Sequence, residues 1–326
     1  MVTGAGGFVG GHAAVRLAAE GVRVRAFVRN PSKKTVVNLS HPNIRIEVGD
    51  LLDVESCRRA ARSTQVVIHA AIDRAKQASQ VRSVIIEGTR NLYEAARDAG
   101  VARFLYLSSL SVYYGIISRL EQYADRDDCA IPLVPSGDLY GDAKIESERF
   151  LLQQSGLPLV TTFRAPAIIG PGSPRWSVQV LRDARKGRLI VPGAGNFSTS
   201  FVYIDNLVDC LLAAIHAPNP APVYHVIDGH VTYRQLLEPA VDVSGRSPKS
   251  IPLWCVTLFA HFLALYSRCT GRWQRNSLAM IRAIHCESRP LLTAAKARRE
   301  LGWNSQVTFE EAVRRTTEWM QRAEVH

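Results

Sequence analysis

The first ten residues, MVTGAGGFVG at 1–10, read as the end of a β-strand, a glycine-rich turn and the start of a helix. Glycines stand at 4, 7 and 10, in the spacing G-x-x-G-x-x-G. Gly4 allows a tight turn, Gly7 allows a phosphate group to approach the backbone, and Gly10 allows the helix to pack closely on the strand. Backbone N–H groups at the start of a helix attract anions. The segment therefore predicts a binding site for the pyrophosphate of a dinucleotide.

The residues around this turn complete the pattern. Phe8 and Val9 contribute N–H groups at the start of the helix, which continues through Ala13–Ala19. A second strand is predicted at Val22–Val28, giving the order strand, turn, helix, strand that a dinucleotide site requires. The first strand is short, because only three residues precede the turn, and a central parallel strand normally has about five. We therefore expect either a clipped first strand or a natural start upstream of Met1.

The residues after the second strand bear on the choice of cofactor. Arg29 stands there, with Lys33 and Lys34 just beyond, and no Asp or Glu lies between Val22 and Ser40. A carboxylate at this place would bind the ribose hydroxyls of NAD(H), whereas cations suit a 2′-phosphate. The sequence therefore favours NADP(H), with NAD(H) as the alternative if these are only solvated loop charges.

The first half of the chain alternates strand and helix patterns. Further strands are predicted at Ile44–Val48, Val66–Ala70, Phe104–Ser108 and Val160–Phe163, and helices at Val54–Arg62 and Gly88–Ala99. This succession is typical of an α/β fold with a Rossmann-type, doubly wound parallel sheet. We predict a dinucleotide-binding domain at 1–168 with a returning segment near 200–228. Residues 169–199 and 229–326 would form a smaller, mostly helical substrate-binding region.

Composition limits the partners and the compartment. The chain has 326 residues, a net charge of +11 and six scattered cysteines without a C-x-x-C pair. We therefore predict no metal site and no disulfide framework. The chain begins directly in the glycine turn without a visible signal peptide, so a cytoplasmic protein is expected. The basic residues form no dense run or aromatic-interleaved stripe, so nucleic-acid binding is not predicted.

The most apolar stretch is IPLWCVTLFAHFLALY at 251–266. It is shorter than the ~20 residues that span a bilayer, and His261 interrupts it. One interpretation is a helix that covers a buried apolar pocket. The other is a helix that touches a membrane peripherally through 251–275, with Arg268, Arg272 and Arg275 near lipid head groups.

Tyr140 and Lys144 stand four residues apart in YGDAK. On a helix this spacing places both side chains on one face. A lysine ammonium beside a tyrosine favours the phenolate and lowers the pKa of the phenol from its usual value near ~10. The pair could then exchange a proton with a substrate oxygen.

Several motifs occur in an order and spacing that resemble the extended short-chain dehydrogenase/reductase family over nearly the whole chain. They are T-G-x-x-G-x-x-G at 3–10, GDL at 49–51, HAA at 69–71, EGTRN at 87–91, SSLSVY at 108–113, Y-x-x-x-K at 140–144, Arg164 with GPG at 170–172, FVYIDNL at 201–207 and ELGW at 300–303. The chain looks like the NAD-dependent epimerase/dehydratase type of this family. FVYIDNLVDCLLAA and the apolar stretch are most similar to its 3β-hydroxysteroid dehydrogenase branch. Sugar-nucleotide epimerases and flavonoid-type ketone reductases share most of these motifs.

The resemblance implies roles for individual residues. Tyr140 would be the general acid/base, and Lys144 would assist it and bind the nicotinamide ribose. Ser109 would polarise the substrate carbonyl, with Ser108 and Ser111 as alternatives. The remaining residues implied for the cofactor site are Gly4, Gly7, Phe8, Val9, Gly10, Arg29, Asp50, Leu51, Ala70, Ala71, Ser108 and Pro166. Asp50 would accept a hydrogen bond from the adenine amine, although it could instead cap the helix that begins near Val54.

The chain departs from the family at three places. Ile85 stands where an asparagine is common, the usual Arg-Pro pair is Arg164-Ala165-Pro166, and Val-Tyr-Gly carries one extra tyrosine at 114. These departures leave the acid/base pair intact but affect the substrate side.

The resemblance implies an NAD(P)-dependent oxidoreductase that acts on an alcohol or ketone. Aromatic residues suggest an apolar, sterol-like or polycyclic substrate. They are Trp176, Phe197, Phe201, Trp254, Phe259, Phe262 and Trp273. Two alternatives stay open. A nucleotide-sugar epimerase would use cations such as Arg175, Arg182, Arg185 and Arg188, and a non-catalytic NAD(P)-binding scaffold would need no acid/base pair. Members of the family often form homodimers through two helices, here near 88–99 and 140–154.

Overall fold

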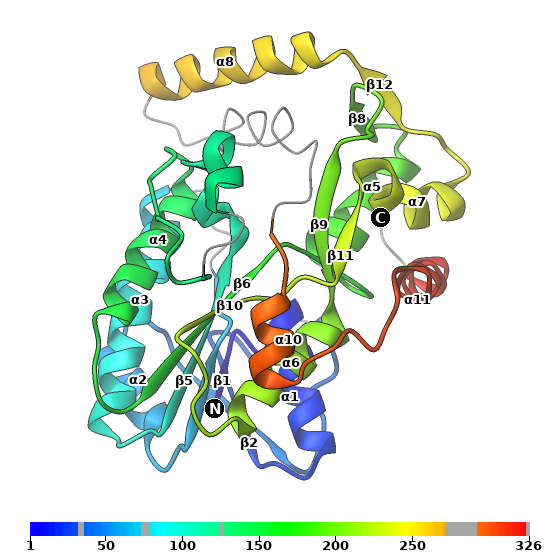
Figure 1. The fold of residues 1–326 in the computed structure, drawn as a ribbon. Coiled ribbons are helices and arrows are strands. Elements are labelled where there is room, and N and C mark those ends of the chain that lie inside the picture. Colours follow the sequence, from blue (N-terminus) through cyan, green and yellow to red (C-terminus); the bar gives the residue numbers. More distant parts are fainter. Residues whose placement is uncertain (32–35, 73–77, 124–126, 271–291, 324–326) are drawn as a thin grey trace.

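A computed structural model describes residues 1–31, 36–72, 78–123, 127–270 and 292–323. Its centre is a seven-stranded parallel sheet in the order β10-β6-β5-β4-β1-β2-β3 (Figure 1). The strands are β1 (Val2–Thr3), β2 (Val24–Val28), β3 (Ile44–Val48), β4 (Val66–His69), β5 (Arg103–Ser109), β6 (Leu159–Ala165) and β10 (Val223–His225). The strand order reverses beside β1, as in a doubly wound sheet. The predicted Rossmann-type α/β fold is confirmed.

Two layers of helices cover this sheet (Figure 1). One face carries α1 (Phe8–Ala19) and α6 (Ile204–His216), and the other carries α2 (Val54–Ala61), α3 (Ala78–Asp98) and α4 (Leu139–Leu152). Each layer has its own apolar core, which includes Leu17 and Leu211 on the first face and Leu92 and Leu151 on the second. The predicted helix at 88–99 begins ten residues earlier than expected, at Ala78.

The register of the sheet fixes where its strands end. β5 pairs with β6 over seven residues, from Arg103 opposite Leu159 to Ser109 opposite Ala165. β1 lies between β2 and β4, with Val2 opposite both Ala26 and Ile68. All these strands are parallel, so their carboxyl ends meet at one edge of the sheet. In open α/β sheets ligands bind at this edge.

The second region consists of small sheets and helices. β7 (Ala167–Ile169), β9 (Ser198–Tyr203) and β11 (Gly229–Thr232) form a three-stranded sheet, and β8 (Ile190–Pro192) pairs with β12 (Lys249–Ile251). The helices of this region are α5 (Val180–Arg185), α7 (Tyr233–Ser244) and α11 (Phe309–Arg322), preceded by a π-helical turn at Pro174–Gln179. α10 (Ala295–Leu301) returns beside α6 and β10 (Figure 1).

Buried Asn206 joins the returning segment to the C-terminal part of the chain. Its amide nitrogen donates to Asp228 Oδ2 (2.8 Å) and to the carbonyl of Val307 (2.9 Å). Its amide oxygen accepts from the N–H of Val307 at 3.0 Å. The indole of Trp303 donates to the Asn206 carbonyl at 2.8 Å. These bonds link the motif at 201–207 to the segment that contains Trp303 and Val307.

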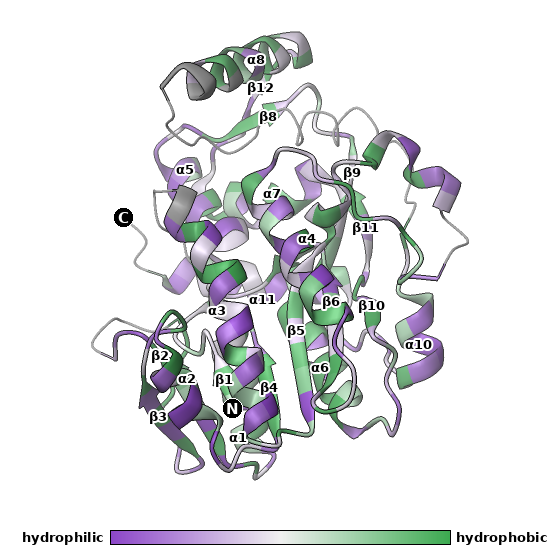
Figure 2. Ribbon diagram, turned by 90° about the vertical axis from the view of Figure 1, so that its left-hand side faces the viewer, coloured by the Kyte–Doolittle hydropathy of each residue, from purple (hydrophilic) through white to green (hydrophobic). Residues whose placement is uncertain are grey.

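The apolar stretch forms β12 and then α8 (Leu253–Thr270), which lies along one end of the molecule (Figures 1 and 2). Its large side chains face outward, since Trp254 is 69% exposed and Phe262 is 62% exposed. The interpretation of α8 as the cover of a buried pocket is therefore wrong for its described residues. Within the described part of the chain, no helix is long and apolar enough to cross a bilayer. Arg272, Trp273 and Arg275 lie outside the described residues.

Candidate active site

Hydrogen bonds fix the start of α4, the helix that carries Tyr140 and Lys144. The carboxylate of Asp138 caps the helix by accepting from the N–H of Gly141 at 2.8 Å. Gly141 leaves no room for a side chain, because a Cβ there would lie 2.8 Å from the carbonyl oxygen of Ser111. This close approach packs the first turn of α4 against the turn that follows β5. Tyr140 therefore lies beside the carboxyl end of a central strand.

Lys144 is almost completely buried, with 1% of its surface exposed. Its ammonium donates to the carbonyl of Leu107 at 2.7 Å. The nitrogen lies 4.4 Å from the ring centre of Tyr106 and 5.9 Å from that of Tyr140. Burial lowers the pKa of Lys144 to about 7, and the nearby carboxylate of Glu148 opposes this shift. A group with a pKa near neutrality can hold or release a proton under ordinary conditions.

A buried ion pair lies one helical turn beyond Lys144. Glu148 and Arg164 are 0% and 1% exposed, and Arg164 Nη2 lies 2.6 Å from Glu148 Oε2. Arg164 Nε donates to the same oxygen at 3.0 Å and to Glu148 Oε1 at 3.3 Å, so both carboxylate oxygens accept from the guanidinium. The hydroxyl of Ser108 also donates to Glu148. The pair therefore joins α4 to the adjacent strands β5 and β6.

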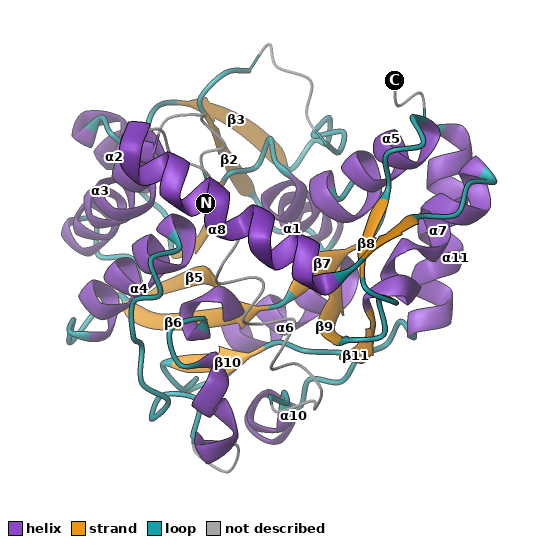
Figure 3. Cartoon of the chain, turned by 90° about the horizontal axis from the view of Figure 1, so that it is seen from above, coloured by secondary structure: helices purple, strands orange, loops and turns teal. Residues whose placement is uncertain are grey.

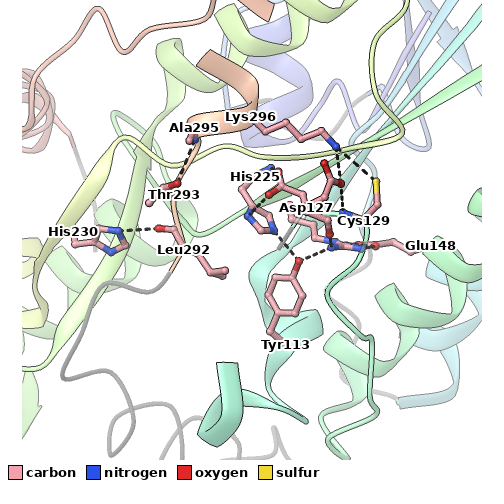
Figure 4. A network of polar contacts seen from close by, with 12 residues as sticks. Tyr113, Asp127, Cys129, Glu148, His225, His230, Leu292, Thr293, Ala295 and Lys296 are labelled. Atoms are coloured by element: carbon pink, nitrogen blue, oxygen red, sulfur yellow. Dashed lines mark hydrogen bonds and ion pairs between the residues drawn. The ribbon is translucent and has the colours of Figure 1, made fainter. Parts of the chain in front are cut away.

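The network continues from Arg164 across the sheet (Figure 4). Arg164 donates to the hydroxyl of Tyr113 and, at 2.7 Å, to the carbonyl of Asp128. The Tyr113 hydroxyl lies 2.7 Å from Nε2 of His225, and Nδ1 of His225 lies 3.1 Å from Asp128 Oδ1. Burial lowers the pKa of His225 to about 3, so this imidazole is neutral. Sequence reasoning missed Glu148, Asp128 and His225.

The three serines at the end of β5 and just beyond it differ in their surroundings. Ser108 is 3% exposed, and its hydroxyl is bound to Glu148. The hydroxyl oxygen of Ser109 accepts from the N–H of Ser111 at 3.2 Å, which leaves its proton available to another group. Among the described residues the buried hydroxyl oxygen of Ser111 has no hydrogen-bond partner. Ser109 and Ser111 therefore remain candidates for a ligand contact, whereas the Ser108 side chain faces the ion pair.

The glycine turn at the N-terminus forms a close-packed cradle. Gly4 has a φ of +67°, and a Cβ there would lie 2.8 Å from the carbonyl oxygen of Ala70. A Cβ on Gly10 would overlap the carbonyl oxygen of Gly4. Gly7 is the N-cap of α1 and brings no side chain to the first N–H groups of the helix. These features fit a pyrophosphate, which accepts hydrogen bonds from such N–H groups.

Comparison with known proteins agrees with this geometry. Residues 1–228 match the NAD dependent epimerase/dehydratase family. The chain belongs to this family. It is an enzyme of the extended short-chain dehydrogenase/reductase type, and the resemblance seen in the sequence is confirmed. Its use of a nicotinamide dinucleotide is confirmed at the level of the family.

Individual relatives cover almost the whole chain. The 3-beta-hydroxysteroid dehydrogenase of Mycolicibacterium neoaurum is 28% identical and covers 96% of this chain and 88% of its own length. The UDP-glucose 4-epimerase of Vibrio cholerae is 26% identical and covers 98% and 94%. Among solved structures, the UDP-glucose 4-epimerase of Thermus thermophilus with NAD has a TM-score of 0.74 at 21% identity and covers 99% and 98%. This last likeness concerns the fold alone.

The other residues implied for the cofactor site lie around the carboxyl edge of the sheet in this family member. The structure places Asp50 and Leu51 after β3, Ala70 and Ala71 after β4, and Pro166 after β6. Arg29 follows β2 and is exposed, whereas Lys33 and Lys34 lie outside the described residues. Phe8 and Val9 are buried in the first turn of α1.

The carboxylate of Asp50 does not cap α2, which corrects one of the two sequence interpretations. Asp53 is the N-cap and accepts from the N–H of Glu55 at 3.0 Å. Asp50 Oδ1 accepts from the N–H of Leu52 at 3.0 Å. Leu51 is buried, and its carbonyl accepts from the amide of Asn91 at 3.0 Å.

The aromatic residues proposed for a substrate pocket do not all lie together. Phe201 is buried and packs edge-on against Phe309. Trp176 and Phe197 both contact the ring of Tyr233. Trp176, Phe201 and Phe309 pack in one apolar core, whereas the aromatic side chains of α8 face outward, so the described aromatics do not line one common pocket.

The buried ion pair between Glu148 and Arg164 predicts that loss of the Glu148 charge lowers the stability of the protein. Glu148→Gln leaves the buried Arg164 guanidinium without its counter-charge, so the free energy of unfolding should fall by about 3–5 kcal/mol. Glu146→Gln is the matched control, because Glu146 pairs with Arg82 at 2.5 Å on the exposed face of the same helix. That change should cost less than about 1 kcal/mol. Urea unfolding of the three proteins measures both values, and equal effects would contradict the assigned role of the buried pair.

Proposed function

We propose that this enzyme interconverts a secondary alcohol and a ketone on an apolar, sterol-like or polycyclic substrate, with NADP(H) as the preferred cofactor. The observation that carries the reaction type is the buried Lys144 ammonium beside Tyr140 at the end of β5. The family supports a nicotinamide dinucleotide as the redox partner. The full-length similarity to a 3-beta-hydroxysteroid dehydrogenase supports the substrate class.

Tyr140 and Ser109 would both form hydrogen bonds with the substrate oxygen. When bound, the nicotinamide ring supplies the hydride acceptor for oxidation or the hydride donor for reduction. Tyr140 takes the hydroxyl proton when the alcohol is oxidised and returns a proton when the ketone is reduced. Ser109 donates a hydrogen bond to the same oxygen, where negative charge develops. Lys144 stabilises the negative charge on the Tyr140 oxygen through its nearby ammonium.

The buried network would hold these groups in place. Glu148 lies one turn after Lys144, and its ion pair with Arg164 fixes α4 against β6. Gly141 holds the start of α4 against the turn that contains Ser109 and Ser111. A fixed arrangement of this kind lowers the cost of bringing the reacting groups together.

A nucleotide-sugar epimerase is the second candidate, supported by the similarity to the Vibrio cholerae enzyme. Its phosphate-binding cations would come from Arg175, Arg182, Arg185 and Arg188. The guanidinium of Arg175 stacks over Trp176 at 5.6 Å, and Arg185 donates to the carbonyl of Ala323. The homodimer through α3 and α4 stays a prediction.

Tyr140→Phe tests the acid/base assignment. The variant keeps the ring but loses the proton, so turnover should fall by about 10²-fold or more while cofactor affinity changes little. The measurements are nicotinamide absorbance with a steroid alcohol or ketone, and cofactor titration by fluorescence. Full activity in the variant would contradict the assignment.

The same assay separates the candidate functions. Turnover of UDP- or dTDP-sugars in place of steroids would favour the epimerase. Cofactor binding without turnover of any alcohol, ketone or nucleotide sugar would favour the non-catalytic scaffold.

Arg29 tests the cofactor preference. Arg29→Glu removes a cation expected beside the 2′-phosphate and adds a repulsive charge, so NADPH affinity should fall by about 10- to 100-fold. NADH affinity should stay equal or rise. Arg23→Glu is the matched control, since Arg23 is also exposed but precedes β2 at the opposite end of the strand. Isothermal titration with both cofactors gives the values, and tighter NADH binding by the unmodified protein would contradict the preference.

A further inference from the structure

Helix α8 presents an unusually exposed set of large apolar side chains. Their exposed fractions run from 38% to 69% in Trp254, Leu258, Phe259, Phe262, Leu265 and Tyr266. Figure 2 shows hydrophobic residues along this helix, which lies at the edge of the molecule. Single exposed apolar residues are ordinary, but a contiguous group marks an interaction surface.

The six side chains lie on one face of the helix. With a rotation of about 100° per residue, they occupy an arc of about 140°. Ala260 falls on the opposite side of the helix and is 1% exposed. Thr257 and His261 border the apolar arc and, with Trp254 and Leu258, line a shallow open groove. We call the six residues the α8 face.

The sequence around α8 is basic and contains no acidic residue. No Asp or Glu occurs from Val243 to Cys286, a stretch that contains Arg246, Lys249, Arg268, Arg272, Arg275 and Arg282. Arg246 and Lys249 are exposed and lie before α8, Lys249 at the start of β12. The whole chain carries a net charge of +11. Such a segment is attracted to anionic lipid and is repelled by a second copy of itself.

Helix α8 lies on the same side of the molecule as the candidate active site. Figures 1 and 3 show the helix crossing the side of the molecule on which the parallel strands end. Ser109, the last residue of β5, lies at this same edge of the sheet. A surface that contacts the α8 face would therefore lie on the side of the site at which a ligand enters.

The geometry points to the surface of an anionic bilayer as the partner of the α8 face. The helix has 18 residues, a length of ~27 Å, and would lie flat with its apolar arc among the acyl chains and the exposed Arg246 and Lys249 near the head groups. This placement agrees with the finding that no described helix can cross a bilayer. An apolar alcohol or ketone would then enter the site from the lipid phase, and this last step rests on the proposed function.

Vesicle flotation tests the proposal. The full chain is mixed with vesicles of phosphatidylcholine alone or of phosphatidylcholine with phosphatidylglycerol, at low and high salt. We expect binding to the anionic vesicles that weakens with salt. Leu258→Gln with Phe262→Gln places two amides at the centre of the α8 face, so the affinity should fall at least about tenfold.

Val22→Gln with Leu157→Gln is the matched control. These residues are 44% and 57% exposed, and they precede β2 and β6 at the opposite edge of the sheet. The control should bind vesicles like the unmodified protein, and circular dichroism checks that both double variants fold. No binding of the unmodified protein to anionic vesicles, or equal binding of the α8 variant, overturns the proposal. A dimer in solution that the α8 variant dissociates, without vesicle binding, overturns it in favour of self-association.

Turnover separates this proposal from the proposed function. Vesicle binding is measured without substrate. If the protein binds vesicles but oxidises no apolar alcohol, the membrane-docking proposal stands and the proposed substrate class is contradicted. With a detergent-dispersed substrate the α8 variant should keep the activity of the unmodified protein. A loss of that activity at unchanged vesicle binding would place α8 in the site instead and overturn the proposal.

Discussion

The burial of one ammonium, that of Lys144, is the constraint on which the site depends. Its nitrogen is held by the Leu107 carbonyl and by the rings of Tyr106 and Tyr140. Burial makes the charged form costly, and the carboxylate of Glu148 offsets part of that cost. This balance keeps a proton exchangeable near neutral pH beside Tyr140. The same residue would be an ordinary, permanently charged lysine on an exposed helix face.

The ion pair between Glu148 and Arg164 connects the helix that carries Lys144 to the central sheet. Glu148 belongs to the helix of the acid/base pair, and Arg164 belongs to a central strand. Through Tyr113 and His225 the network reaches the edge strand β10, which comes from the returning part of the chain. The buried polar contacts therefore join α4 to β5, β6 and β10 of the central sheet.

The parts of the account that depend on local spacing could be predicted from the sequence. The glycine turn and the spacing of Tyr140 and Lys144 each lie within ten residues, so short-range geometry decides them. The contact between Tyr113 and His225 could not be predicted, because the two residues are 112 positions apart and meet only when β10 joins the sheet. Hydrophobicity predicted a helix near 251–266, but packing of the whole chain decides which of its sides is exposed.

The titration of Lys144 tests the central claim most directly. In cofactor-free protein with isotope-labelled lysine, NMR follows each side chain with pH, and the spectrum of Lys144→Met identifies the resonance. We predict a pKa of about 7 for Lys144. The unfolded chain keeps this proton up to about pH 10.5, so the free energy of unfolding should rise between about pH 7 and 10.5 relative to Lys144→Met. A Lys144 resonance that titrates near the usual ~10.4 would contradict the buried placement beside Tyr140.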